Sequence, residues 1–108
     1  MNNLDDILKM AQNVQAKMAE AQGKLDTIEV EGVSGGGLVR IKATAKGTIR
    51  AVSIDDSLME RQEKSILEDL IAAALNDTRA KADQVGSEHM KSFAGDLPLP
   101  PGFELPGL

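Results

Sequence analysis

The chain of 108 residues contains no cysteine, tryptophan or tyrosine, and its two aromatic residues are Phe93 and Phe103. Without cysteine it forms no disulfide, no thiolate metal site and no cysteine nucleophile. With so few aromatic rings it offers no platform on which the bases of single-stranded nucleic acid could stack. If the partner is a nucleic acid, these absences favour a duplex held through its phosphates.

The sequence has no segment with the pattern of a signal peptide or a membrane span. Its first residues lack a basic region followed by an apolar one, and no apolar run approaches the roughly 20 residues that cross a bilayer. We therefore expect a cytoplasmic protein without a membrane partner. A chain of 108 residues forms one domain with a modest core, for which burial in an oligomer would be favourable.

Candidate catalytic and metal-binding residues are few. His89 is the single histidine, and no second histidine or cysteine is available to complete a metal site, so we interpret it as a helix-face residue. The turn Ser34–Gly37 lacks the Gly-Lys-Ser/Thr ending of a phosphate-binding loop and lies between two predicted strands. We therefore expect no enzyme, no metal, no cofactor and no small-molecule substrate.

Apolar residues near the N-terminus alternate at spacings of three and four, which predicts a helix over Asn3–Asp26, roughly 36 Å long. Such a helix is longer than a small domain covers, so its stripe predicts contact with a second copy. An amphipathic helix lying on its own sheet explains the same pattern, and both interpretations hold if different faces are used. The candidate dimer-interface residues are Leu4, Ile7, Ala11, Val14, Met18, Ala21 and Leu25.

The segment Gly32–Ile54 contains four basic residues and no acidic residue, although the formal net charge of the chain is -5. Its basic residues are Arg40, Lys42, Lys46 and Arg50. Alternation predicts antiparallel strands over 29–31, 38–45 and 49–54, with a bulge near Arg50 where the alternation breaks. We expect Arg40 and Lys42 on one face, which is either a surface for a polyanion or ordinary surface decoration.

A second long helix is predicted to begin at Ser57–Glu60, which has the form of a capping box. Its broad apolar face from Leu67 to Leu75 predicts packing on the sheet. Beyond Leu75 the stripe narrows, and Gly86 is expected to loosen the helix, so that its second half projects as an arm. The Pro-rich residues 97–108 predict an extended tail after a domain formed by residues 1–96.

Short motifs follow one another in a specific order along the chain. They are Leu8–Gln12, Gln15–Met18, Glu29–Gly32, Ser34–Val39, Ile54–Asp55, Ser57–Leu58, Leu67–Ala74, Asn76–Asp77 and Leu99–Phe103. In this order the chain resembles the YbaB/EbfC family of bacterial nucleoid-associated proteins over nearly its whole length. The resemblance implies an α+β fold with a long N-terminal helix, a three-stranded antiparallel sheet and a long C-terminal helix, assembled as a tweezer-like homodimer.

The resemblance also implies binding of double-stranded DNA in the cytoplasmic nucleoid with little sequence preference, and an influence on nucleoid organisation or gene expression. By this resemblance, and with Lys42 added from the basic segment, the candidate DNA-binding residues are Lys9, Lys17, Arg40, Lys42, Arg79 and Lys81. Two features depart from the family pattern: Glu104 stands where a basic residue is common, and the pI near 4.8 is low for a duplex binder. An alternative hypothesis is therefore a dimeric adaptor that binds a DNA-maintenance or replication protein, with weak or indirect DNA contact.

Overall fold

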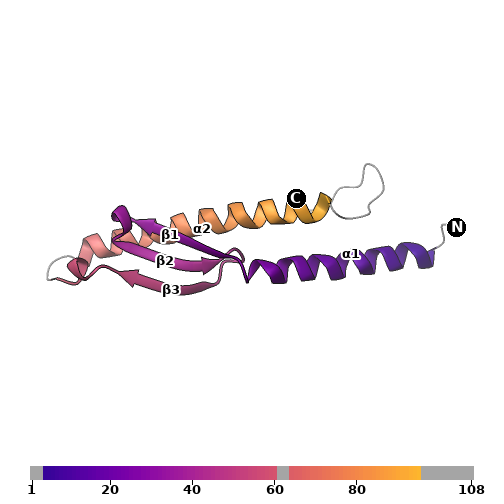
Figure 1. Ribbon diagram of the computed structural model, residues 1–108, viewed down its shortest axis with the longest axis horizontal. Helices are drawn as coiled ribbons and strands as arrows, with labels where there is room; N and C mark the ends of the chain where they lie inside the picture. Colours follow the sequence, from indigo (N-terminus) through magenta and orange to yellow (C-terminus); the bar gives the residue numbers. More distant parts are fainter. Residues whose placement is uncertain (1–3, 61–63, 96–108) are drawn as a thin grey trace.

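The computed structural model describes residues 4–60 and 64–95, so the predicted tail over residues 97–108 lies outside the described residues. The main elements follow in the order α1 (Leu4–Leu25), β1 (Glu29–Ser34), β2 (Val39–Thr44), β3 (Ile49–Ile54) and α2 (Lys64–Gly95). Figure 1 shows α2 lying along the sheet, while α1 and the end of α2 extend from the same end of it. The predicted α+β order of helix, three-stranded antiparallel sheet and helix is confirmed.

The molecule is strongly elongated. Its radius of gyration is 19.9 Å and it measures 73 × 21 × 17 Å. A compact domain of this length would have a radius of gyration of about 13 Å. Much of the chain therefore lies far from the core, and the two helical extensions cover little of each other's surface.

The sheet has the strand order β1-β2-β3, with both neighbouring pairs antiparallel. Gly35, Gly36 and Gly37 all have positive φ angles, of 60°, 67° and 101°, which explains why glycine occupies this turn. In the second pair Lys42 is opposite Ala51 and Ala43 is opposite Ile49, so Arg50 is the extra residue of a bulge. The bulge predicted near Arg50 is confirmed.

The core lies between the sheet and one face of α2. Val39, Ile41 and Ala43 of β2 are completely buried, whereas Arg40 and Lys42 between them are exposed on the opposite face. The buried positions of α2 recur every four residues and carry small side chains, at Ala74, Thr78, Ala82 and Gly86. Small side chains at this spacing allow the helix to lie close to β1 and β2.

Two expectations about α2 are wrong. Ser57 does not start the long helix, because Asp56–Met59 forms a short 3₁₀ turn (η2) in which the Asp55 carboxylate accepts hydrogen bonds from the Ser57 backbone and hydroxyl. Packing also does not end near Leu75, since α2 is continuous and its contact with the rest of the chain extends to Gly86. A Cβ at Gly86 would lie 3.3 Å from the carbonyl oxygen of Ala45, so this glycine permits close approach and does not loosen the helix.

Candidate nucleic-acid interface

The outer face of the sheet is less positive than the basic segment suggests. Arg40 and Lys42 are both exposed there, as predicted. However, Glu31 of the neighbouring strand β1 pairs in register with Lys42, and its Oε1 lies 2.9 Å from Nη1 of Arg40. One of the two cations on this face is therefore engaged by an internal ion pair, and the face carries charge of both signs.

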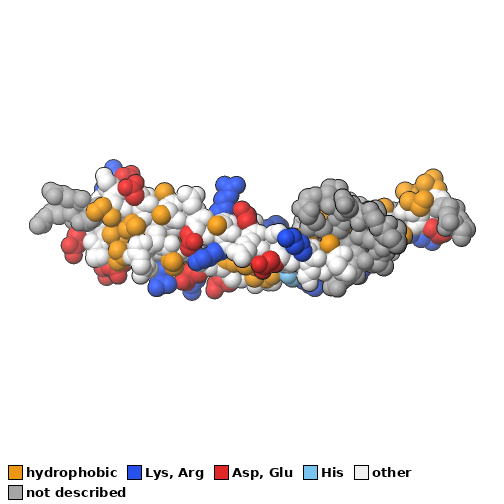
Figure 2. Space-filling view, turned by 90° about the horizontal axis from the view of Figure 1, so that it is seen from above, with side chains coloured by type: hydrophobic (Ala, Val, Ile, Leu, Met, Phe, Trp, Pro, Cys, Tyr) orange, Lys and Arg blue, Asp and Glu red, His pale blue; other side chains and the backbone are white. Residues whose placement is uncertain are grey.

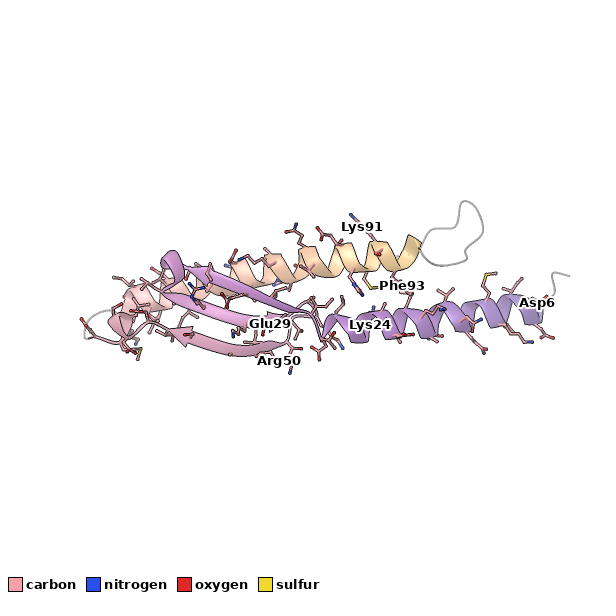
Figure 3. The ribbon with its side chains drawn as sticks, viewed as in Figure 1. Asp6, Lys24, Glu29, Arg50, Lys91 and Phe93 are labelled. Carbon is pink, nitrogen blue, oxygen red and sulfur yellow. The ribbon has the colours of Figure 1, made fainter. Side chains whose placement is uncertain are left out.

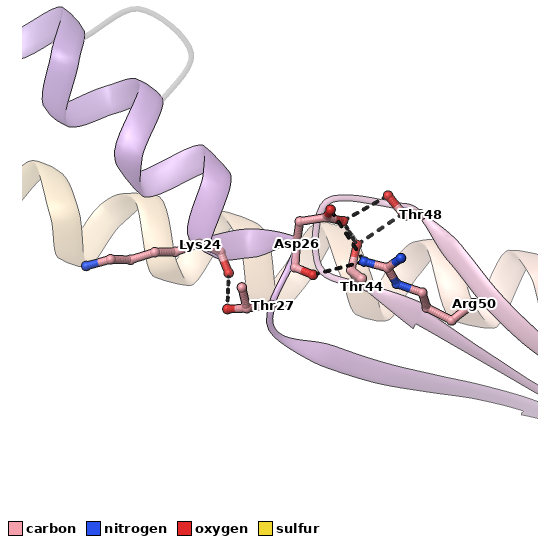
Figure 4. Close-up of polar contacts among 6 residues, drawn as sticks. All are labelled: Lys24, Asp26, Thr27, Thr44, Thr48 and Arg50. Atoms are coloured by element: carbon pink, nitrogen blue, oxygen red, sulfur yellow. Dashed lines mark hydrogen bonds and ion pairs between the residues drawn. The ribbon is translucent and has the colours of Figure 1, made fainter.

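Arg50 is likewise engaged within the chain. Its guanidinium is 3.4 Å from the Asp26 carboxylate, which also accepts hydrogen bonds from the hydroxyls of Thr44 and Thr48, each at 2.9 Å. Asp26 directly follows α1, whereas its partners lie on β2, β3 and the turn between them (Figure 4). This cluster fixes the end of α1 to the sheet and so sets where the α1 extension begins.

The hydrogen bond from Thr44, then that from Thr48 and the charge of Arg50, lower the pKa of Asp26 below its ordinary value of 3.8. The carboxylate therefore stabilises the fold above that value, and the stabilisation is lost as the pH falls through the lower pKa of the folded state. We expect the melting temperature of the wild type to fall as the pH is lowered below about 4. Asp26→Asn, which cannot ionise, should show a smaller fall.

Circular dichroism melts across this pH range test the expectation. Asp83→Asn is the matched control, because Asp83 is exposed and makes no hydrogen bond or ion pair with the described residues. Its melts should follow those of the wild type. Identical pH profiles for the wild type and Asp26→Asn would contradict the stabilising role of the Asp26 cluster.

Lys81 is engaged at the opposite edge of the sheet. Its Nζ is 3.0 Å from the Asp77 carboxylate and donates a hydrogen bond to the backbone carbonyl of Glu31 at 2.9 Å. Asp77 also accepts a hydrogen bond from the backbone N–H of Val33. This bond, and to a smaller extent the hydrogen bond from Lys81, lowers the pKa of the Asp77 carboxyl. Both side chains come from α2 and close the outer edge of β1.

The other four candidate cations are Lys9, Lys17, Lys42 and Arg79. All four are exposed, and none forms an ion pair with the residues of ranges 4–60 and 64–95. Lys9 and Lys17 lie on α1, as expected. Arg79 and Lys81 do not lie on a projecting arm, because the neighbouring Thr78 and Ala82 are buried against the sheet. The structure therefore distributes the candidates over α1, the outer face of β2 and the sheet-bound part of α2.

Among the described residues, further exposed cations without an ion pair were not among the candidates: Lys46, Lys64 and Lys91. Lys46, in the turn between β2 and β3, lines the same groove as Arg79 of α2. The sequence contained a signal for Lys46, since it belongs to the segment without acidic residues. Lys91 lies near the end of α2 and points away from α1, whereas Phe93 lies on the side facing α1 (Figure 3). In the view of Figure 2 acidic and basic side chains are mixed along the molecule.

The candidate dimer stripe on α1 is divided between two environments. Ala21 and Leu25 are buried within the chain, where Leu25 approaches Gly86 of α2. Leu4 and Ile7 near the start of the helix are 68% and 58% exposed. The helix therefore packs on its own chain through its last turns, while its first turns present apolar side chains to solvent.

A hollow of about 280 Å³ lies between α1 and the end of α2 and is lined by Lys17, Lys24, His89 and Phe93, among others. His89 is half-buried there, as expected for a helix-face residue at an edge. No group of three or more histidine or acidic residues that could hold a metal gathers within the described part of the chain. Neither described helix has the length and apolar composition needed to cross a membrane.

The structure is that of an elongated α+β protein that presents exposed cations, mixed with acidic side chains, on α1, β2 and α2. The YbaB/EbfC DNA-binding family matches residues 1–97, and the chain belongs to this family. It is 50% identical over 99 residues to a nucleoid-associated protein of Nitrobacter hamburgensis, covering 92% of this chain and 93% of that protein. It is 46% identical over 106 residues to a nucleoid-associated protein of Brucella anthropi, covering 98% and 99%.

Among solved structures the chain is similar to the uncharacterized protein HP0035 from Helicobacter pylori, with a TM-score of 0.69 and 22% sequence identity. The match covers 89% of this chain and 97% of the other. At this identity the similarity supports the fold alone. The family and its nucleoid-associated relatives favour the DNA-binding hypothesis over the adaptor hypothesis.

Proposed function

We propose that the protein is a homodimer that binds double-stranded DNA through phosphates, with little sequence preference, in the cytoplasmic nucleoid. The observation that carries this proposal is that four of the candidate cations, Lys9, Lys17, Lys42 and Arg79, are exposed without an ion pair to the described residues, in a chain of a DNA-binding family. Such cations replace the counterions of phosphates, whereas Arg40 and Lys81 must first leave Glu31 and Asp77.

The homodimer doubles each cation by symmetry, but it also doubles the net charge of -5 per chain, so DNA binding depends on where the cations lie and not on their number. On α1, the stripe residues available to a partner are Leu4, Ile7, Ala11, Val14 and Met18, since Ala21 and Leu25 pack internally. The two helical extensions of each chain project from one end of the sheet, as the arms of a tweezer-like dimer require. Domain 1–96 would act without catalysis, metal or cofactor, through effects on nucleoid organisation or gene expression.

The proposal is tested by a mobility-shift titration of a labelled duplex at low salt, followed by competition with unrelated duplexes of equal length. We expect binding, and unrelated duplexes should compete at concentrations within about threefold of one another. Proteins discriminate between sequences through contacts to base edges, each worth about 1–3 kcal/mol, and binding through phosphates does not use such contacts. One duplex that competes a hundredfold better would contradict the lack of sequence preference. Absence of binding by a folded protein would favour the adaptor hypothesis.

A further inference from the structure

The first turns of α1 carry apolar side chains that the described part of the chain leaves exposed. Val14 and Ile7 lie seven and fourteen residues before Ala21, so the helical period places all three on one side of α1. Ala21 is buried and borders the hollow with Phe93 of α2, whereas Val14 is half-buried and Ile7 is 58% exposed. Met10 lies between Ile7 and Val14 on the same side and is 42% exposed. Ile7, Met10 and Val14 form the α1 row, which loses its cover toward the start of the helix.

The α1 row loses its cover where α2 ends. The two helices run in opposite directions, and Figure 1 shows α1 continuing well beyond the last residue of α2, Gly95. Phe93 lies on the side of α2 that faces α1 (Figure 3) and borders the same hollow as Lys17, which is one turn from Val14. A segment that covers Ile7 and Met10 would therefore have to continue beyond Gly95 in the direction of α2.

The sequence after Gly95 has the length and the composition of such a segment. It contains all four prolines of the chain, and its large apolar side chains are Leu97, Leu99, Phe103, Leu105 and Leu108. At about 3.1 Å per residue, residues 96–108 would reach roughly 40 Å in an extended polyproline conformation. The turns of α1 before Lys17 span about 20 Å. Proline also restricts the unbound segment, so that less conformational entropy is lost when it docks.

Charge and attachment favour docking within one chain. Beyond Lys91 the sequence contains the acidic residues Asp96 and Glu104 and no basic residue. Lys17, at the edge of the α1 row, is exposed and makes no ion pair with the residues of ranges 4–60 and 64–95. The segment begins after Gly95, beside the hollow, and this attachment gives it an effective concentration on the order of 1 mM at the α1 row.

We propose that residues 97–103 dock on the α1 row of the same chain and tie the first turns of α1 to the end of α2. The contact occupies one flank of the apolar stripe and leaves Leu4 and Ala11 available to a second copy. It also fixes the orientation of the turns that carry Lys9, a candidate phosphate contact. Docking goes beyond the proposed function, because it requires neither DNA nor a second copy.

The first test uses fluorescence, because the chain contains no tryptophan and Phe103→Trp introduces a single fluorophore into the proposed contact. We expect its emission at shorter wavelength than that of a free peptide of residues 96–108 with the same substitution, since docking removes the ring from water. Met10→Asp in this variant should move the emission to that of the free peptide, because a carboxylate replaces an apolar contact.

Gln12→Asp is the matched control for Met10→Asp, since Gln12 is exposed on the opposite side of α1. It should leave the emission of the Phe103→Trp protein unchanged. Both variants should keep the helical circular dichroism, because Met10 and Gln12 are exposed.

A second test places no charge in the contact. The chain has no cysteine of its own, so non-reducing electrophoresis reports the disulfide between two introduced cysteines. Met10→Cys/Phe103→Cys should form a disulfide within one chain at least about tenfold faster than Gln12→Cys/Phe103→Cys, because a disulfide requires Cβ atoms only about 4 Å apart. A mixture of the single variants Met10→Cys and Phe103→Cys should give few linked chains, since neither contains both partners.

The outcomes separate docking from the proposed function. Equal emission of the Phe103→Trp protein and the free peptide, equal disulfide rates for the two cysteine pairs, or an emission that Met10→Asp does not change would overturn docking on the α1 row. Rapid linking of two chains in the mixture would overturn docking within one chain and place the segment on the α1 row of a second copy. A protein that docks this segment but binds no duplex would refute the proposed function alone. DNA binding with the segment undocked would refute docking alone.

Discussion

Gly32→Ala is expected to destabilise the protein by about 3 kcal/mol, since a buried backbone contact would be overpacked. Gly32 lies on β1 beneath α2, and a Cβ there would be 2.5 Å from the backbone nitrogen and 2.7 Å from the Cα of Thr78, and in contact with its hydroxyl. Backbone atoms in the middle of a 32-residue helix do not move aside as a side-chain end does. The helix must therefore shift as a whole.

Urea unfolding followed by circular dichroism measures the effect at one fixed protein concentration. Gly23→Ala is the matched control, because nothing lies within 4 Å of a Cβ at this position on α1. It should raise the stability by about 0.5–1 kcal/mol, since alanine restricts the unfolded chain more than glycine does. Unfolding midpoints of Gly32→Ala and the wild type that coincide would contradict the close packing of α2 on β1.

Neutralising Lys42 and Arg79 together is expected to weaken duplex binding roughly tenfold to a hundredfold at low salt, because each neutralised phosphate adds to the counterion release. Both side chains are exposed and make no ion pair with the described residues. The variant Lys42→Gln/Arg79→Gln removes two positive charges from each chain. The slope of its log affinity against log salt should be shallower by about 0.9 for each phosphate that the variant no longer neutralises.

The control Arg40→Gln/Lys81→Gln removes the same charge from cations that are already paired with Glu31 and Asp77. We expect the affinity for DNA to fall by less than about fivefold, because these cations are already paired with a carboxylate in the protein before DNA binds. A second pair, Lys9→Gln/Lys17→Gln, measures the share of α1. Equal effects of the paired and unpaired sets would mean that net charge alone determines the affinity.

The sequence predicted the order and type of the elements because their signals are local. Spacings of three and four marked α1, and the broken alternation around Arg50 marked the bulge that keeps Ile49 on the core side of β3. The contact of α2 with the sheet beyond Leu75 was missed, because Thr78, Ala82 and Gly86 look weakly apolar in sequence. Their small size permits close packing, which becomes evident only in the structure, where Gly32 lies opposite Thr78 and the Ala45 carbonyl lies opposite Gly86.

The candidate site was predicted less completely, because its charges depend on pairing between distant segments. The segment that contains Arg40 and Arg50 has no acidic residue of its own. Its acidic partners come from other elements: Glu31 from the register of β1 with β2, and Asp26 from the end of α1. Whether a cation is available to phosphate therefore follows from the fold and not from the local count of charges.

The central claim is that this acidic protein binds duplex DNA through phosphates. The most direct test measures the affinity of the wild type for a duplex at a series of salt concentrations. For about four phosphates contacted at once, the plot of log affinity against log salt should be linear with a slope of about -3.6. Unrelated duplexes should give the same slope. A folded protein that shows no binding at low salt, or binding that salt does not change, would contradict binding through phosphates.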